Sequence, residues 1–164
     1  MDHPLYNTHV KLLASDLLSL TPVPSSNPNP VSFSRNGTLL SRAETVGTVI
    51  SRDLRPEKYL KFVVDDGTAC VGCILWLNHL SSPYFSRRCA PDVRIIAQAA
   101  NRFASEVKLG AVARVRGRIT MYRSEVQITV SDVVVDRDPN AEILHWLDCM
   151  RLARRCYDVV APRK

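Results

Sequence analysis

Three arginines at alternate positions are the clearest chemical feature of the sequence. Arg114, Arg116 and Arg118 lie in the segment GAVARVRGRITMYR, whose remaining positions are largely small or β-branched. Because successive side chains of a β-strand point to opposite faces, this spacing predicts one external row of guanidinium groups, here called the arginine row. Burying three unpaired guanidinium groups would cost several kcal/mol each, which excludes the opposite register. Cations placed in this way are suited to the phosphates of a polyanion.

Basic charge is concentrated around this row. Residues 86–123 hold nine Lys and Arg against two Asp and Glu, whereas the whole chain of 164 residues has a net charge of +6. A local excess of this kind favours a site for nucleic acid or another polyanion. The alternative, a solvated face that only keeps the protein soluble, stays open at this level.

Aromatic side chains lie close to these cations along the sequence. Single-stranded nucleic acid is bound by flat rings that stack on bases, at about 1–3 kcal/mol per base, together with cations for the phosphates. Core packing is the alternative role for each ring, and pairing with acids of the next strand is the alternative for the arginines. The predicted DNA-binding residues are Trp76, Tyr122, Arg118, Arg116, Arg123, Lys61 and Phe62, with Tyr59 as a further candidate ring.

Other chemistry is weakly indicated. Cys70 and Cys73 form a C-x-x-C, but strand residues three apart face opposite sides and no second pair completes a zinc site, so two buried thiols are expected. Asp65 and Asp66 precede a glycine, which suits a turn better than acid–base catalysis. The sequence contains no phosphate-binding glycine loop and no nucleophile elbow. We therefore expect no catalytic residue, no metal and no cofactor.

Hydrophobic periodicity predicts the elements that position these residues. Alternating β-branched residues predict three strands between about residues 45 and 77, joined in part by the acidic turn at 65–67. Apolar residues then recur every three to four positions over 92–108, which predicts an amphipathic helix with Asp92 as its N-cap and Gly110 as its stop.

Period two returns after this helix. Two strands are expected in 110–123 and 124–136, and a last helix begins at Asp138 and Pro139. Five strands with a helix between the third and fourth are the element order of an OB-fold, so we predict an all-β fold with added helices: a five-stranded OB-fold β-barrel and a C-terminal helix. Inward positions are predicted at Ala113, Val115, Gly117 and Ile119 in the fourth strand and at Val126, Ile128 and Val130 in the fifth.

The chain is predicted to be one soluble domain with short appendages. It is 46% hydrophobic without any run of about 18 apolar residues, it lacks a secretion signal, and its odd number of cysteines, five, suits a reducing compartment. The predicted division is an N-terminal extension at 1–40 with a proline-rich loop at 21–32, the barrel at 41–136, a C-terminal helix at 137–158 and a basic tail at 159–164. Whether THVKLLASDLL forms a strand or a helix is left open.

The C-terminal helix has an apolar stripe four turns long and contains a tryptophan, which is favoured as an anchor at interfaces. A small barrel covers only part of such a helix, so the rest is predicted to meet a partner. The alternative is that the helix closes an open end of the barrel. The predicted partner-binding residues are Ile143, Trp146, Leu147, Met150 and Tyr157.

Several motifs together resemble a known family. The run AETVGTVISRDLRPEKYLKFVVDDGTACVGCILWL, the segment RVRGRI followed by Y-R, and the helix DPNAEILHWL resemble the OB-fold STN subunit of the telomere-capping CST complex, in its short plant form without C-terminal winged-helix modules. The resemblance covers about residues 5–157. A more distant similarity is to the middle subunit of replication protein A.

This resemblance implies a nuclear, non-enzymatic protein at telomeres. Such a protein binds G-rich single-stranded DNA within a heterotrimer with a small OB-fold subunit and a large subunit, and it assists fill-in synthesis by DNA polymerase α-primase. The matching positions are Trp76, Tyr122 and Arg118 for DNA and Ile143, Leu147 and Met150 for the small subunit. The alternatives are a mainly structural adaptor with weak DNA affinity and a single-stranded-DNA-binding protein like replication protein A. An RNA-binding module or an OB-fold hydrolase is disfavoured.

Overall fold

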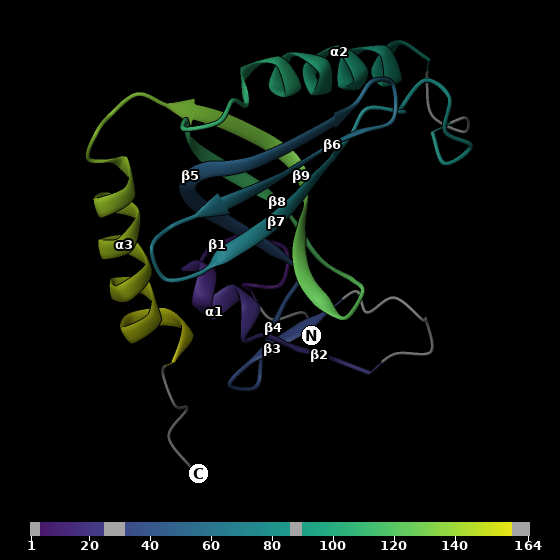
Figure 1. The fold of residues 1–164 in the computed structure, drawn as a ribbon. Coiled ribbons are helices and arrows are strands. Elements are labelled where there is room, and N and C mark those ends of the chain that lie inside the picture. Colours follow the sequence, from purple (N-terminus) through teal and green to yellow (C-terminus); the bar gives the residue numbers. More distant parts are fainter. Residues whose placement is uncertain (1–3, 25–31, 86–89, 159–164) are drawn as a thin grey trace.

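Five strands close into a barrel in the computed structural model, which describes residues 4–24, 32–85 and 90–158 (Figure 1). Hydrogen-bonded neighbours follow the order β5-β6-β7-β9-β8, and β8 also pairs with β5, so the ring is complete. This confirms the predicted OB-fold barrel. The strands are β5 (Arg42–Arg55), β6 (Tyr59–Asp65), β7 (Cys70–Trp76), β8 (Val112–Tyr122) and β9 (Glu125–Asp136).

The long strand β5 allows the barrel to close. Its first half, residues 42–48, pairs with β8, and its second half, residues 48–55, pairs with β6. The pairing with β6 shifts between Val49 and Ser51. An irregularity of this kind bends a strand and increases its twist, so that one strand can serve two neighbours at an angle.

A second irregularity lies in the pairing of β8 with β9. Their register shifts between Arg116 and Gly117, and a Cβ added to Gly117 would lie 2.1 Å from the carbonyl oxygen of Thr129. Only glycine fits this position without displacing the backbone of β9.

Alternate residues of the strands fill the barrel. Every inward position predicted for the fourth and fifth strands is buried, including Gly117, so the predicted faces of β8 and β9 are correct. The largest buried side chains that join them from other elements are Phe33, Phe62, Leu12, Leu17, Leu40 and Leu60.

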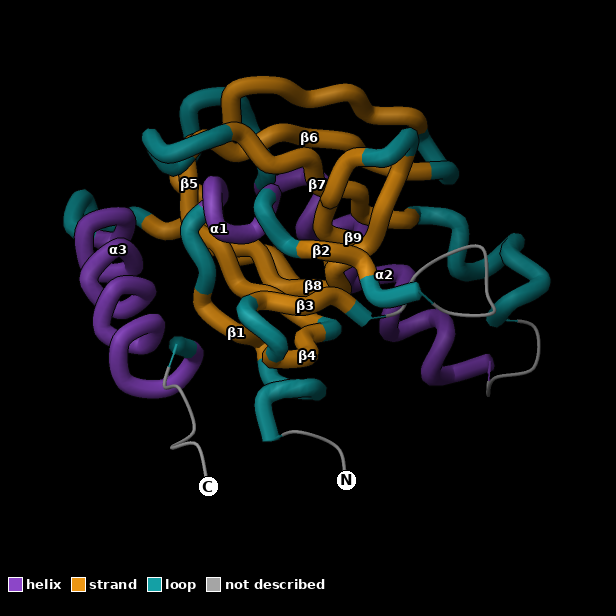
Figure 2. Tube along the Cα trace, turned by 90° about the horizontal axis from the view of Figure 1, so that it is seen from below, coloured by secondary structure: helices purple, strands orange, loops and turns teal. Residues whose placement is uncertain are grey.

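The N-terminal segment contains both a strand and a helix. β1 (His9–Lys11) runs parallel to β5, and α1 (Ala14–Leu18) lies in the lower mouth of the barrel, with Leu17 fully buried (Figure 2). A small sheet of β2 (Thr21–Pro22), β3 (Phe33–Arg35) and β4 (Thr38–Leu40) lies below the same mouth. The segment THVKLLASDLL, for which the sequence left strand and helix open, therefore forms a strand followed by a short helix.

The predicted proline-rich loop at 21–32 is wrong at its first two residues. Thr21 and Pro22 form the edge strand β2, where a proline is tolerated because its missing N–H faces away from the partner strand. Residues 25–31 and the predicted basic tail at 159–164 lie outside the described residues. The division of the chain at residues 40, 136 and 158 stays a prediction.

Helix α2 (Ala90–Glu106) lies across the opposite mouth (Figure 1). Its buried residues Val93, Ala97, Ala100 and Ala104 are small, so the helix lies close to the strands. The predicted helix is confirmed with shifted bounds: Asp92 lies in the first turn rather than at the N-cap. Among glycines, Gly110 has a φ of +81°, which suits a stop soon after the helix.

Helix α3 (Ala141–Leu152) runs along the flank of the barrel and continues into a π-helical turn, η1 (Ala153–Tyr157). It starts later than predicted. Asp138 accepts a hydrogen bond from the Asn140 N–H through its side chain and one from the Ala141 N–H through its carbonyl, so Asp138 and Pro139 form a turn ahead of the helix. None of the described helices has the length and apolar character that a membrane crossing requires.

The C-terminal end of α2 is held by Arg52 of β5. Its guanidinium donates to the carbonyl oxygens of Val107 at 2.8 Å and Ala104 at 3.1 Å. Ala104 lies in the last turn of the helix and Val107 follows its last residue, and at this end the helix dipole favours a cation. We expect Arg52→Met, which keeps the aliphatic stem, to lower the free energy of unfolding by about 2 kcal/mol and the Tm by about 4–8 °C.

Arg55→Met is the matched control, because Arg55 is exposed and its ion pair with Asp53, at 3.5 Å, is screened by solvent. Its effect should stay within about 0.5 kcal/mol in urea unfolding. Equal effects of the two substitutions would contradict the capping role.

Candidate nucleic-acid interface and partner helix

A continuous set of rings and cations crosses the outer face of the barrel. The rings of Tyr59 and Trp76 meet edge to face with centroids 6.0 Å apart. The Lys61 Nζ lies 5.0 Å from the Tyr59 ring centroid and 4.7 Å from that of Tyr122, and the Arg123 Cζ lies 5.2 Å from the Tyr122 ring centroid. We call these five residues the ring–cation cluster. Four of them were predicted DNA-binding residues, and Tyr59 was the further candidate ring.

Strand geometry explains why the cluster forms. Tyr59 and Trp76 are partners in the β6–β7 pairing, so their side chains share one face. Tyr122 ends β8, where Arg123 and Ser124 adopt φ values of +51° and +65° in a tight hairpin turn to β9. This turn brings the Tyr122 ring beside Lys61, although the two residues belong to strands that do not pair.

Two rings of the cluster are accessible to solvent. Trp76 is 41% exposed and Tyr122 is 48% exposed. Each ring is already in contact with a neighbouring ring or cation, so its orientation is held while a large part of its surface stays exposed. Rings arranged in this way can stack on unpaired bases.

Phe62 was predicted to contact DNA, and this prediction is wrong. Phe62 is 2% exposed and belongs to the main core. It lies one position after Lys61 on β6, so the alternation that puts Lys61 outside puts Phe62 inside.

Glu44 of β5 pairs with two arginines of the arginine row. Its carboxylate is buried and accepts hydrogen bonds from Arg114 at 2.9 Å and from Arg116 at 2.5 Å. Arg114 also pairs with Asp136 at 3.2 Å. Two of the three guanidinium groups are therefore bound to acids of the protein itself. The alternative to phosphate binding named acids of the next strand, but only Asp136 belongs to that strand, whereas Glu44 belongs to β5. The prediction that Arg116 is unpaired is wrong.

Arg118 has a different environment. It is exposed, and no carboxylate of the described residues lies within ion-pair distance of it. Arg118 lines a groove of about 500 Å³ together with Trp76, Tyr84 and Thr129. Arg118, which has no acidic partner among the described residues, therefore lies in the same groove as the exposed indole of Trp76.

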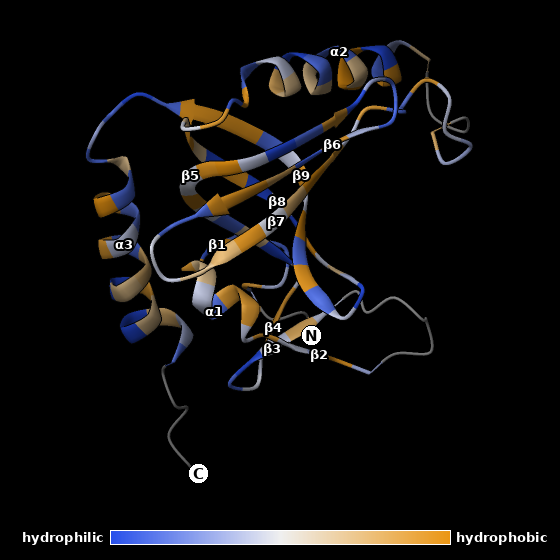
Figure 3. Ribbon diagram, viewed as in Figure 1, coloured by the Kyte–Doolittle hydropathy of each residue, from blue (hydrophilic) through white to orange (hydrophobic). Residues whose placement is uncertain are grey.

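The outward face of α3 is apolar. Ile143, Leu147 and Met150, all predicted to bind a partner, are 61%, 55% and 44% exposed, and Leu144 is 54% exposed. Figure 3 shows the hydrophobic colour on the side of α3 that points away from the barrel. The structure therefore places three predicted residues on one open surface, which we call the α3 face.

The inward face of α3 is small and polar instead. Ala141, His145 and Cys149 are buried at four-residue spacing. The imidazole Nε2 of His145 lies 3.3 Å from the Leu12 carbonyl oxygen, and Lys11 Nζ lies 2.6 Å from the Asp148 carboxylate. Because these contacts attach the helix to the barrel, its apolar stripe is not used for docking.

Tyr157 was predicted to bind a partner, and the structure places it in the core instead. It is 7% exposed and packs with the barrel residues. In a regular α-helix, Cys156 would lie two turns after the buried Cys149 and face inward as well. The π-helical turn, in which the Asp158 N–H donates to the Ala153 carbonyl oxygen, adds one residue to the turn. Tyr157 therefore faces inward instead of Cys156.

Trp146 is fixed by the barrel rather than free as an anchor. Its indole N–H donates to the Asp66 carbonyl oxygen at 3.0 Å, and its ring covers Gly67. It still lines a groove of about 330 Å³ with Ile143, Leu147 and Met150. Trp146 can therefore form one wall of a partner site.

The cysteines that the structure describes differ in burial. Cys73 is buried as predicted, and burial raises the pKa of its thiol, but Cys70 is exposed, so the prediction of two buried thiols is wrong for Cys70. Burial likewise raises the pKa of the Cys149 thiol to about 12. Among residues 4–24, 32–85 and 90–158, no group of three or more His, Cys, Asp or Glu is placed to hold a metal ion.

No family model matches the chain. One curated relative decides the family: the CST complex subunit STN1 of Arabidopsis thaliana is 52% identical over 160 residues, which cover 97% of this chain and 98% of that protein. The chain belongs to the STN1 family. The STN1 of Homo sapiens is 26% identical over 163 residues, and there the match covers 94% of this chain but 43% of the relative.

Two solved structures are similar to this STN1-family chain in fold. A Stn1–Ten1 complex of S. pombe matches with a TM-score of 0.70 and 19% identity, covering 92% of this chain and 94% of that one. A replication protein A heterotrimer bound to single-stranded DNA matches with a TM-score of 0.66 and 18% identity, covering 90% and 97%.

Sequence reasoning missed several residues around the groove that Trp76 and Arg118 line in this STN1-family chain. Arg42 of β5 is the partner of Arg118 in the β5–β8 pairing and lines the adjoining hollow below α2. Tyr84, 70% exposed, and His79 come from the connection between β7 and α2. The aromatic pair Tyr84 and Phe85 beside the basic segment was a usable signal, whereas the role of Glu44 depends on a pairing over 72 residues.

Glu44 should also give stability a pH dependence. Burial would raise its pKa, but hydrogen bonds from Arg116 and Arg114 and their charges outweigh burial and hold the pKa below the ordinary 4.5. Because the folded value is depressed, the pair stabilises the fold above the ordinary pKa, and this stabilisation is lost as the pH falls through the folded value.

We therefore expect Glu44→Gln to lower the free energy of unfolding by roughly 2 kcal/mol at pH 7 and by much less at pH 3. Urea unfolding of both proteins at intervals between about pH 7 and pH 3 measures the difference. Parallel stability curves at all pH values would show that Glu44 is not the titrating group.

Proposed function

We propose that the chain is a single-stranded-DNA-binding and scaffold subunit of a telomere-capping CST complex, acting in the nucleus at chromosome ends. The proposed role is one of binding and does not include catalysis. The family membership and the named STN1 relative support the complex, and the ring–cation cluster supports the ligand. The wider proposal includes G-rich telomeric DNA, a large partner subunit and help to fill-in synthesis by DNA polymerase α-primase.

One observation carries the DNA part of the proposal. An exposed indole and an arginine that has no acidic partner among the described residues line one groove, on a face that also presents Tyr122, Lys61 and Arg123. Successive bases would stack on Trp76 and Tyr122 while Arg118 and Arg123 neutralise phosphates. Stacking tolerates any base, so the contacts within this face favour single strands more strongly than they favour a sequence.

Substitutions at this face should separate stacking from charge. We expect Trp76→Ala and Tyr122→Ala each to weaken the binding of a labelled G-rich single strand by about 5- to 100-fold, because each removes about 1–3 kcal/mol of stacking. Arg118→Ala should weaken binding less and reduce the slope of log affinity against log salt by about 0.7. Fluorescence anisotropy over a salt series measures both quantities.

Arg102→Ala is the control for Arg118→Ala, because Arg102 is also exposed and lies on α2, with its Cζ 5.7 Å from the Phe103 ring. The control should leave the affinity nearly unchanged. If Trp76, Tyr122 and Arg118 are all replaced together and the affinity does not fall, the site assignment is wrong.

We further propose that the α3 face binds a small OB-fold subunit of the Ten1 kind. A Stn1–Ten1 complex is the assembly named for the S. pombe structure of the same fold. Four apolar side chains on this face are each at least 44% exposed, and a groove of about 330 Å³ lies beside them. A patch of this kind on one helix suits a partner that covers it.

A charge placed in this face should abolish partner capture. We expect Leu147→Asp and Met150→Asp to weaken binding of the purified Ten1-type subunit more than about 100-fold, since an unpaired charge in a buried interface costs about 3 kcal/mol or more. Ile50→Asp is the matched control: Ile50 is apolar and 50% exposed, but it lies on β5.

Size-exclusion chromatography with light scattering, together with calorimetric titration, measures the association of these variants. DNA affinity should stay unchanged in both α3 variants, which shows that they are folded. Normal capture by both variants would place the partner elsewhere.

A second candidate is a mainly structural adaptor with weak DNA affinity of its own. The Glu44 pairs favour it, because they withdraw Arg114 and Arg116 from phosphate binding. A third candidate resembles replication protein A and binds any single strand. Comparing the isolated chain with the assembled complex, on a G-rich and on a pyrimidine strand, distinguishes all three.

A further inference from the structure

The hollow below α2 contains a second arginine directly opposite Arg118. Arg42, at the start of β5, is the partner of Arg118 in the antiparallel β5–β8 pairing. Residues paired in this way share one face of the sheet and have Cβ atoms about 4.5–5.5 Å apart. Both side chains line the hollow, which has a volume of about 580 Å³. Two guanidinium groups therefore lie side by side at one cavity.

No carboxylate of the protein compensates this pair. Within the part of the chain that the structure describes, no Asp or Glu lies within ion-pair distance of Arg42 or Arg118. Like charges directly opposite each other destabilise a sheet. An anion bound between the two guanidinium groups would replace this repulsion by charge-assisted hydrogen bonds.

The neighbouring row of the same sheet shows the contrast. Two positions earlier on β8, Arg116 lies opposite Glu44 on one side and Asp132 on the other. The Glu44 carboxylate accepts a hydrogen bond from Arg116. On the two sides of Arg118 lie a second arginine and the neutral Thr129. Of these two rows, the row of Arg118 is therefore the one that can accept an anion from outside the protein.

The hollow continues the groove assigned to DNA. Both spaces are lined by Arg118, Thr129 and Val130. From these shared residues the groove extends to Trp76, and the hollow extends to Arg42. A strand with one base on the indole can therefore reach both arginines without leaving the surface, as backbones do in grooves that bind single strands.

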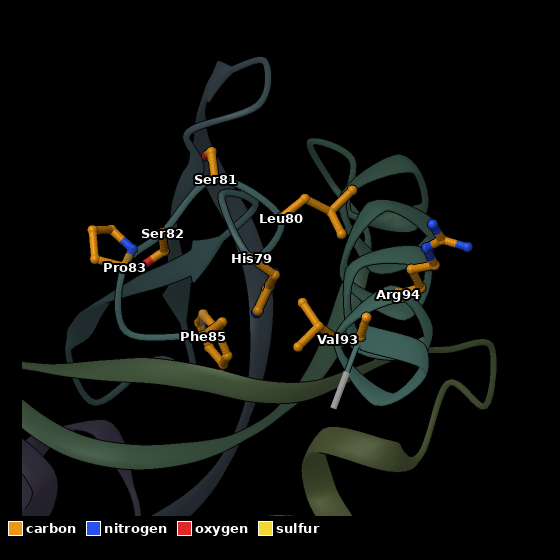
Figure 4. A pocket seen from close by; sticks show the side chains of 9 residues that line it. His79, Leu80, Ser81, Ser82, Pro83, Phe85, Val93 and Arg94 are labelled. Carbon is orange, nitrogen blue, oxygen red and sulfur yellow. The ribbon is translucent and has the colours of Figure 1, made fainter. Parts of the chain in front are cut away.

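Helix α2 contributes apolar side chains to the hollow, among them Ile96 and Phe103. Arg94 of α2 lines a neighbouring hollow instead, and Figure 4 shows its side chain directed away from His79 and Phe85, which border both spaces. The arginines of the hollow below α2 therefore come from β5 and β8.

We propose that Arg42 and Arg118, here called the arginine pair, together bind one phosphate of the single-stranded DNA. The strand then continues from Trp76 across β8 to the start of β5, and Arg42 becomes a further DNA-binding residue. This inference rests on the proposed function, because the groove beside the hollow is the one assigned to DNA. Guanidinium forks match the geometry of phosphate oxygens, and two forks on one phosphate hold the backbone in register.

Salt dependence tests whether the arginine pair shares one phosphate. We expect Arg42→Gln to weaken the binding of a labelled G-rich single strand to the full chain by about 5-fold at low salt. The slope of log affinity against log salt should fall by about 0.7, the value for one phosphate, as it should in Arg118→Ala. Combining both substitutions should again lower the slope by about 0.7, because only one phosphate is released. A combined loss of about 1.4, or no effect of Arg42→Gln, would overturn the inference.

A chemically altered strand locates the phosphate. One uncharged methylphosphonate linkage is moved along a short G-rich strand, one position at a time, and the affinity is measured at each position. At one position the neutral linkage should weaken binding to the unaltered chain but not to Arg42→Gln, and the same position should be silent in Arg118→Ala. Different silent positions for the two variants would assign them to separate phosphates and contradict the arginine pair.

Arg137→Gln is the matched control, because Arg137 is exposed and follows the last residue of β9 rather than lining the hollow. It removes the same charge and should leave the slope nearly unchanged. Without DNA, Arg42→Gln should not lower the Tm, since it removes a contact between like charges. A fall in Tm as large as that of Arg52→Met would give Arg42 a structural role instead.

The remaining outcomes separate this inference from the proposed function. If Trp76→Ala and Tyr122→Ala weaken DNA binding but Arg42→Gln does not, the inference is wrong while the DNA site stands. If Arg42→Gln leaves DNA affinity unchanged and weakens capture of the Ten1-type subunit, the hollow binds a protein and the inference is also wrong. A chain that binds no single strand at all overturns the proposed function, and the inference falls with it.

Discussion

The side chain and backbone of one residue, Asp66, connect three parts of the structure. Its carboxylate accepts hydrogen bonds from the Ala14 N–H at 2.7 Å, from the Thr68 N–H at 2.9 Å and from the Thr68 hydroxyl at 2.6 Å. Its carbonyl accepts the indole N–H of Trp146 at 3.0 Å. The turn between β6 and β7 is thereby tied both to the start of α1, inside the barrel mouth, and to α3 on the flank. A buried carboxylate is stable here because several donors surround it.

Polar docking of α3 has a consequence for its apolar residues. Since Asp66, Leu12 and Lys11 hold the helix through hydrogen bonds and an ion pair, the attachment needs little apolar burial. The helix can then direct its apolar side chains outward. An arrangement with the apolar stripe inward would have buried it against the barrel and left a polar helix surface. Glu44 acts in a parallel way on the arginine row, because it decides which guanidinium groups are available to a ligand.

Local patterns in the sequence predicted most of the barrel, and long-range pairings limited the prediction of the site. Period-two alternation identified the inward faces of β8 and β9, because that alternation is a property of each strand alone. The partner of Arg116 could not be found in this way, since Glu44 lies 72 residues away and meets it only through the β5–β8 pairing. Tyr157 was misplaced for a different reason: one π-helical turn shifts the helical period by a residue, and the sequence contains no clear signal for it.

The β6–β7 hairpin relates the two proposed surfaces. Tyr59 and Trp76 pair at its open end and belong to the face proposed to bind DNA, whereas Asp65 and Cys70 pair at its turn end, beside the Asp66 contact to α3. Seven paired residues separate these ends by roughly 20 Å, so a base on the indole and a partner on the α3 face do not compete for space. Both strands of the hairpin are hydrogen-bonded within a closed barrel, which resists bending. This rigid spacing allows DNA and the partner subunit to be bound at the same time, each surface contributing its own affinity. It gives no direct reason to expect a conformational signal from one surface to the other.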